Sequence, residues 1–307
     1  MNTQIRNPPR CWLLLFSTIP VFSFARADEP RPIEHARFDE YCEGPVFDYD
    51  GNLFVSHGKS SVAKITPAGR VTRWLEAENP NGHKVLPDGT HLLCIRDAVL
   101  HLAADASILR RASTQCNGAE LRAPNDITLS PRGGFYFTDP GGSRTAPIGT
   151  IHYVDTKWNT QLAANGLWVP NGLDGRKLYV AETVPNRILW FDVKPGGMLG
   201  EINVFARLPS KPGAQAEPDG LAVDTRGNLY VAHLGMSSVQ ILSPDANLLL
   251  TLAAGNYDAS NLVFGGPRMD RLYVTGSSGH RSNSPGRVYR LDLPGVAGAA
   301  SLLPRKK

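Results

Sequence analysis

The sequence lacks several features that would indicate other classes of protein. Its 307 residues include four cysteines and eight histidines, with no Cys-x-x-Cys pair or close Cys/His spacing, which argues against a structural zinc site. No stretch of ten or more residues has the apolar period of a helix, so a helical solenoid is excluded. The Gly-x-Ser-x-Gly turn that carries the nucleophile of many serine hydrolases is also absent.

The chain has little excess charge of either sign once its first residues are set aside. The formal net charge is +4, and residues 1–27 contribute three arginines and no acid, so the rest of the chain carries +1. Nucleic-acid binding usually needs a basic stripe. Only Arg305, Lys306 and Lys307 cluster positive charge. We therefore predict a small-molecule partner and no nucleic acid.

The N-terminus has the pattern of a secretory signal peptide. Two arginines, Arg6 and Arg10, precede a mostly apolar run over 11–24, and Ala25-Arg26-Ala27 resembles a cleavage site. We predict a signal peptide over 1–27 and one domain over 28–307, periplasmic or secreted, with no stable membrane anchor after cleavage. A retained N-terminal anchor is the alternative.

Three cysteines remain after that cleavage, in a compartment that permits disulfides. They are Cys42, Cys94 and Cys116. Because their number is odd, at least one thiol is free or pairs with another chain.

A repeat of about 43 residues organises the chain. A turn with Asp, Gly, Asn or Pro precedes a short apolar and aromatic run six times, and one residue of each run marks the register: Phe54, Leu93, Tyr136, Tyr179, Tyr230 and Tyr273. The intervals of 39, 43, 43, 51 and 43 residues are typical of propeller blades. The sequence thus predicts an all-β, six-bladed β-propeller.

The fifth repeat shows the four antiparallel strands expected in one blade. Short apolar runs over 220–223, 229–232, 239–242 and 248–252 are separated by turn residues. A strand near Phe38 is expected to close the ring with the last blade and remove its open edge. A β-sandwich is the alternative, but it does not require a sixfold period.

Polar residues recur at the start of each innermost strand. Eleven residues before the register lie Glu43, Asn125 and Asp219, and Asn171 matches them eight residues before its own. Innermost strands converge on the axis of a propeller, so these side chains are expected to face one another. Oxygen ligands with two carboxylates suit a hard divalent cation, most simply Ca²⁺, although other divalent ions are possible.

The alternative for each of these positions is an ordinary turn, since Pro-Asn-Gly and Pro-Asp-Gly are common turn formers. Four such positions in register on one axis favour the metal site. Asn81 of the second repeat and Ser260 of the sixth occupy the same place, and we expect them to contact the substrate.

Four short segments resemble the SMP-30/gluconolactonase/luciferin-regenerating-enzyme family. They are Glu43-Gly44-Pro45, Ala123-Pro124-Asn125-Asp126, Pro170-Asn171-Gly172-Leu173 and Pro218-Asp219-Gly220-Leu221. The resemblance implies metal ligation by Glu43, Asn171 and Asp219, ligation or substrate contact by Asn125, and a general-base role for Asp219. Arg122 is the only candidate for a substrate-facing arginine, and it stands one residue out of place.

Three residues beyond the register, the second strand of each blade is expected to return to the mouth of the tunnel. The side chains there are His57, Arg96, Asp139, Glu182 and His233. Titratable groups above a metal could select a substrate and move protons. His57, Glu182 and His233 are the predicted substrate contacts, and a surface or hydrogen-bonded structural role is the alternative for each.

These observations predict a metal-dependent hydrolase of a small ester, most simply a sugar lactone. The metal would polarise the carbonyl while Asp219 assists the attack of water. Phosphotriester hydrolysis at the same site and a non-catalytic, calcium-stabilised binding propeller are the alternatives.

Overall fold

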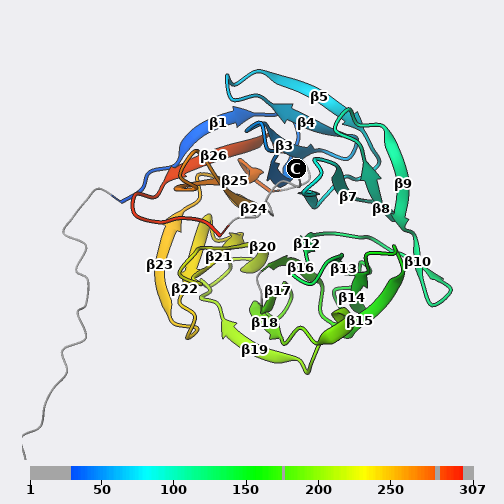
Figure 1. Ribbon diagram of the computed structural model, residues 1–307. Coiled ribbons are helices and arrows are strands. Elements are labelled where there is room, and N and C mark those ends of the chain that lie inside the picture. The colour runs from blue at the N-terminus through cyan, green and yellow to red at the C-terminus, as the bar shows by residue number, and fades with distance from the viewer. Residues whose placement is uncertain (1–28, 175–176, 281–283, 300–307) are drawn as a thin grey trace, which may run out of the picture.

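The computed structural model describes residues 29–174, 177–280 and 284–299, which form six four-stranded antiparallel sheets around a central axis (Figure 1). Each sheet is one blade, and in the first five blades the strands run from the axis outward in chain order. The predicted six-bladed propeller is therefore confirmed.

The first three blades follow one another along the chain. Blade 1 comprises β2 (Cys42–Phe47), β3 (Leu53–His57), β4 (Ser61–Ile65) and β5 (Val71–Glu76). Blade 2 comprises β6 (His83–Val85), β7 (His91–Ile95), β8 (Ala98–Leu102) and β9 (Ile108–Ser113). Blade 3 comprises β12 (Ile127–Leu129), β13 (Phe135–Asp139), β14 (Gly149–Val154) and β15 (Thr160–Leu167).

The remaining blades complete the ring. Blade 4 comprises β16 (Pro170–Asp174), β17 (Leu178–Glu182), β18 (Arg187–Phe191) and β19 (Asn203–Arg207). Blade 5 comprises β20 (Glu217–Val223), β21 (Leu229–Leu234), β22 (Ser238–Leu242) and β23 (Leu248–Ala253). Blade 6 comprises β24 (Asp258–Gly265), β25 (Arg271–Ser277), β26 (Gly286–Asp292) and β1 (Ile33–Arg37).

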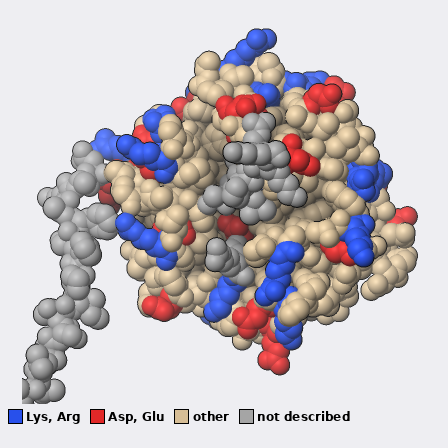
Figure 2. Space-filling view, viewed as in Figure 1, with Lys and Arg blue, Asp and Glu red and all other residues tan. Residues whose placement is uncertain are grey.

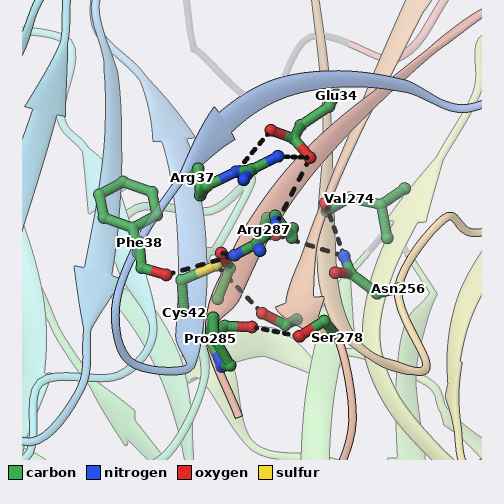
Figure 3. Close-up of polar contacts among 11 residues, drawn as sticks. Glu34, Arg37, Phe38, Cys42, Asn256, Val274, Ser278, Pro285 and Arg287 are labelled. Carbon is green, nitrogen blue, oxygen red and sulfur yellow. Dashed lines mark hydrogen bonds and ion pairs between the residues drawn. The ribbon is translucent and has the colours of Figure 1, made fainter.

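The ring is closed by β1, which pairs antiparallel with β26 as the outermost strand of blade 6 (Figure 1). Figure 3 shows the polar contacts at this seam. Arg287 donates from Nη1 to the Phe38 carbonyl at 3.3 Å, and its Nε lies 3.5 Å from Glu34 Oε2. The chain thus shields the edge of its last blade, as expected from the position of Phe38.

The apolar core lies between the facing surfaces of neighbouring blades. One cluster joins Val46 and Phe54 of blade 1 to Val85 and Leu93 of blade 2, and similar clusters join the other blades. All six register residues are buried. The repeat therefore reflects packing, because each blade repeats the apolar residues that contact its neighbours.

Two small elements were not predicted from the repeat. A hairpin of β10 (Gln115–Cys116) and β11 (Ala119–Glu120) leaves the outer side of the molecule between blades 2 and 3 (Figure 1). A single 3-10 turn, η1 (Pro195–Gly197), follows β18. Within the described ranges, no helix is long and apolar enough to cross a membrane.

The predicted signal peptide over 1–27 lies outside the described residues. Cys42, Cys94 and Cys116 are all buried and unpaired with one another, so the described part of the chain contains no disulfide. On the face shown in Figure 2, basic and acidic side chains are interspersed rather than gathered in a stripe.

Candidate functional site

Five polar side chains lie at the start of the innermost strands, and we call them the axis ring: Glu43, Asn81, Asn125, Asn171 and Asp219. Glu43, Asn171 and Asp219 lie within β2, β16 and β20, whereas Asn81 and Asn125 come two residues before β6 and β12. The carboxylic acids Glu43 and Asp219 are buried, at 4% and 1% exposure. The ring therefore brings together the four predicted metal ligands and the predicted substrate contact Asn81.

Close packing of glycines holds the members of the axis ring side by side. A Cβ atom on Gly44 would lie 2.1 Å from the Asn81 carbonyl oxygen, and one on Gly172 would lie 2.4 Å from that of Asp219. Both distances are far below a normal contact. The glycine that follows the ring residue is thus required for one innermost strand to approach the next.

Hydrogen bonds from side-chain hydroxyl groups also connect neighbouring blades near the axis ring. Ser56 donates to the Asn81 carbonyl at 2.6 Å, and Thr138 donates to that of Asn171 at 3.0 Å. Ser260 donates to the Cys42 carbonyl at 2.9 Å and is completely buried. The structure thus uses the Ser260 hydroxyl to join blade 6 to blade 1, so its predicted substrate contact is not favoured.

The amide oxygens of the axis ring fit a hard cation. The Oδ1 atoms of Asn81, Asn125 and Asn171 are buried, and none has a hydrogen-bond partner among the described residues. A buried polar oxygen without a partner is costly. Together with the carboxylates of Glu43 and Asp219 they form an all-oxygen donor set, which suits Ca²⁺ or a similar divalent ion.

No three His, Cys, Asp or Glu side chains gather at one point within the described ranges. A metal in the axis ring would therefore depend on the asparagine amides as well as on the two carboxylates. Amide oxygens are ordinary ligands for calcium, whereas zinc prefers imidazole and thiolate. The donor set thus favours a hard ion over a transition metal.

A second layer lies immediately beyond the axis ring, where four blades carry glycine: Gly44, Gly82, Gly172 and Gly220. The other two blades, which are opposite one another, place Asp126 and Asn261 there. Asn261 Nδ2 lies 3.4 Å from Asp126 Oδ2. Burial raises the pKa of Asp126 above its ordinary value. These two side chains therefore meet across the axis below the candidate metal site.

The predicted mouth residues Asp139, Glu182 and His233 are buried and hydrogen-bonded. Asp139 accepts the backbone N–H groups of Arg122 and Ala123 at 3.0 and 2.9 Å. Glu182, only 1% exposed, accepts the Trp168 N–H at 2.7 Å and pairs with Arg187 at 2.5 Å. These carboxylates hold the segments that enter β12 and β16.

His233 is likewise buried and hydrogen-bonded. Its Nε2 lies 3.0 Å from Asn186 Oδ1, and Gln240 Nε2 lies 3.3 Å from its Nδ1. Burial lowers the pKa of His233 to about 4, so the ring is neutral at pH 7. The contacts of Glu182 and His233 favour structural roles over the predicted substrate binding.

The other candidates are more exposed. His57 Nε2 lies 2.8 Å from Asp39 Oδ1, and Arg96 pairs with Glu78 at 2.7 Å. Arg122 donates from Nη2 to the Ile148 carbonyl at 2.6 Å. Substrate binding by His57 and Arg122 stays a prediction, since both can still be reached from solvent.

A cavity of about 720 Å³ opens beside the axis ring on the side of blades 1 and 2. Glu43 and Asn81 are among its lining residues, so the cavity reaches the axis ring. A volume of this size is typical of sites for small molecules. The axis ring and this cavity together form the candidate site.

Sequence reasoning missed two features of this region. The first is the Asp126–Asn261 contact. The sequence does contain a signal for it, because Asp126 and Asn261 stand where the other four blades have a glycine. The second is an ion pair from Arg144, in the segment between β13 and β14, to Glu217 at the start of β20. No local pattern indicates the second contact, because it joins blades 3 and 5.

The model of the SMP-30/gluconolactonase/LRE-like region matches residues 35–278. The chain belongs to this family. The match covers all four segments on which the resemblance was based.

Two curated relatives and one solved structure are similar to this chain. Lactonase drp35 of Staphylococcus epidermidis is 29% identical over 215 residues, which are 66% of this chain and 66% of the lactonase. Diisopropyl-fluorophosphatase of Loligo vulgaris is 27% identical over 273 residues, or 76% and 85% of the two chains. A gluconolactonase structure from Xanthomonas campestris superposes with a TM-score of 0.72 at 25% identity, covering 87% and 95%.

Proposed function

We propose that the chain is a metal-dependent hydrolase of a small ester, most simply a sugar lactone. The observation that carries the proposal is the axis ring beside a cavity of ligand size. Three of its buried amide oxygens have no hydrogen-bond partner in the part of the chain that the structure describes, and they stand with two buried carboxylates. Membership of a family with lactonases among its members supports it.

The residues that would hold the ion are Glu43, Asn125, Asn171 and Asp219, and Asn81 would face the substrate or complete the ligand set. A bound divalent ion would supply Lewis-acid polarisation of the ester carbonyl. The carboxylate of Asp219 would accept a proton from the attacking water. The glycine contacts and hydroxyl bonds keep these side chains in place before the substrate arrives, which reduces the cost of ordering them.

The proposal is tested by following acid release from a panel of lactones with the purified chain, with and without a chelator, and with Asp219→Asn. We expect hydrolysis that disappears with the chelator and returns with calcium. Asp219→Asn keeps an oxygen ligand but removes the charge and the base, so kcat/KM should fall roughly 100-fold or more. A folded, calcium-binding protein that hydrolyses none of the lactones would contradict the proposal.

Phosphotriester hydrolysis is the second candidate. The relationship to diisopropyl-fluorophosphatase, which covers 85% of that protein, favours it. The same donor set could polarise a P=O group, since both reactions develop charge on an oxygen at the metal. Including a fluorophosphate in the panel separates the two functions by their relative kcat/KM.

A further inference from the structure

Proline precedes four of the five residues of the axis ring. Its side-chain ring fixes its own φ near about −65° and so restricts the backbone that leads into the next residue. The four pairs are Pro80-Asn81, Pro124-Asn125, Pro170-Asn171 and Pro218-Asp219. Glu43 is the exception, because it follows Cys42. The backbone that presents the Glu43 carboxylate must therefore be held by other contacts.

Blade 6 supplies these contacts through Cys42. The thiol Sγ of Cys42 lies 3.1 Å from the Arg287 carbonyl oxygen (Figure 3) and 3.3 Å from that of Gly276. The Cys42 carbonyl oxygen accepts the Ser260 hydroxyl at 2.9 Å. Cys42 and Ser260 are completely buried, and the low dielectric of the interior strengthens such bonds. Three strands of blade 6, β24, β25 and β26, thus hold one residue of β2.

The partners of the Cys42 thiol are themselves fixed in place. A Cβ atom on Gly286 would lie 2.2 Å from the Glu40 carbonyl oxygen and 3.1 Å from the Cys42 backbone nitrogen. Only glycine therefore lets β26 approach this segment so closely. Asn256 Nδ2 also donates to the Arg287 carbonyl at 3.3 Å. The acceptor of the thiol is thus held by blade 6 independently of Cys42.

The carboxylate of Glu43 follows the backbone on both sides of it. Glu43 Oε2 accepts the N–H of Gly44 at 3.1 Å, which ties the carboxylate to the adjacent peptide. Gly44 has a φ of 52° and lies against Asn81 of blade 2. Blade 2 therefore restrains the chain after Glu43, and blade 6 restrains it before Glu43 through Cys42. A change of the backbone at Cys42 would move a carboxylate that belongs to the axis ring.

We propose that Cys42 is a positioning residue, whose hydrogen bonds to blade 6 fix the backbone of Glu43 and so orient its carboxylate toward the divalent ion. Cys42 would have in blade 1 the role that proline has in the four blades listed above. The inference rests on the proposed function, because it concerns the affinity for the ion that this function requires. Loss of one hydrogen bond of this kind corresponds to roughly a three- to tenfold change in affinity.

The test is calorimetric titration of the chelator-treated full chain with calcium. Cys42→Ala removes the donor, so the Kd for calcium should rise about three- to tenfold. Cys42→Ser keeps a donor of similar size and should restore the native affinity. Ser260→Ala removes the bond to the Cys42 carbonyl and should also weaken calcium binding.

Cys94→Ala is the matched control. This cysteine is as completely buried as Cys42, but it packs in the apolar cluster between blades 2 and 3. The substitution should lower the midpoint of thermal unfolding, as Cys42→Ala does, because both leave a small cavity. It should leave the Kd for calcium unchanged, which separates positioning of Glu43 from a general loss of stability.

Native calcium affinity in folded Cys42→Ala, or an equal loss of affinity in Cys94→Ala, would overturn this inference alone. If Cys42→Ala does not fold, native affinity in Ser260→Ala or lost affinity in Cys42→Ser would overturn it. Calcium binding with the expected dependence on Cys42, but without hydrolysis of any lactone, would support the inference and contradict the proposed function. A native chain that binds no calcium would overturn both.

Discussion

The axis ring and the mouth residues differ in how their polar atoms are satisfied, although both sets were predicted from the same repeat. The amide oxygens of Asn81, Asn125 and Asn171 have no partner among the described residues, whereas Glu182 and His233 are hydrogen-bonded at both ends of their functional groups. The three amide oxygens are therefore available to a ligand, whereas the polar atoms of Glu182 and His233 are used within the fold. The position of a residue in the repeat therefore identifies a ligand site only when the hydrogen bonds of its side chain are also known.

The largest expected difference between the two sets is in their response to calcium. At a calcium concentration about 100 times the Kd, the native chain should gain about 2.7 kcal/mol of unfolding free energy. Asn171→Ala should lose most of this gain, because it removes an oxygen ligand from the axis ring. Thermal unfolding with and without calcium measures the effect. An equal gain in the variant would place the ion elsewhere.

A mouth variant should instead lower stability whether or not calcium is present. Glu182→Gln keeps the size of a side chain that is 1% exposed but removes the charge that pairs with Arg187. We expect a loss of about 1–3 kcal/mol in the free energy of unfolding, measured by urea denaturation. An unchanged midpoint would show that Glu182 does not hold the entry to β16.

The pH dependence of stability gives a further test of the mouth residues, through the buried His233. The folded pKa of His233 is about 4, below its ordinary value of 6.5, because the ring is buried. The unfolded chain therefore binds a proton that the native chain does not, and stability is lost as pH falls from about 6.5 toward 4. His233→Gln should flatten this slope by about 1–3 kcal/mol across the window. Denaturation series at pH 7 and 4.5 would detect it, and an unaltered slope would count against a buried neutral ring.

The smallest effect is expected at Arg96. This residue pairs with Glu78 at the surface, with both side chains more than 60% exposed. Such pairs contribute about 0–1 kcal/mol, so Arg96→Ala should change neither calcium affinity nor the midpoint of unfolding appreciably. A large loss in either measurement would assign Arg96 to the site.

Much of the fold could be predicted because the residues that repeat in the sequence are those that pack between neighbouring blades. The register residues, such as Tyr136 and Tyr230, are the buried contacts between blades. The closure near Phe38 was also confirmed, since an open edge strand needs a partner. The β10–β11 hairpin was not foreseen, because it lies outside the repeat and contributes no apolar period.

The candidate site was predictable in position but less so in detail. The offset from the register placed Glu43, Asn125, Asn171 and Asp219 at the start of four innermost strands, and their role as metal ligands stays a prediction. It could not show that Ser260 turns its hydroxyl to the Cys42 carbonyl, because the direction of a side chain depends on the neighbouring blade.

The most direct test of the metal site is calorimetric titration of the chelator-treated full chain with calcium, alongside Asp219→Asn and Glu182→Gln. We predict one calcium per chain for the native protein, a large loss of affinity for Asp219→Asn, and native affinity for folded Glu182→Gln. Absence of binding by the native chain, or equal affinity in Asp219→Asn, would contradict a metal site in the axis ring.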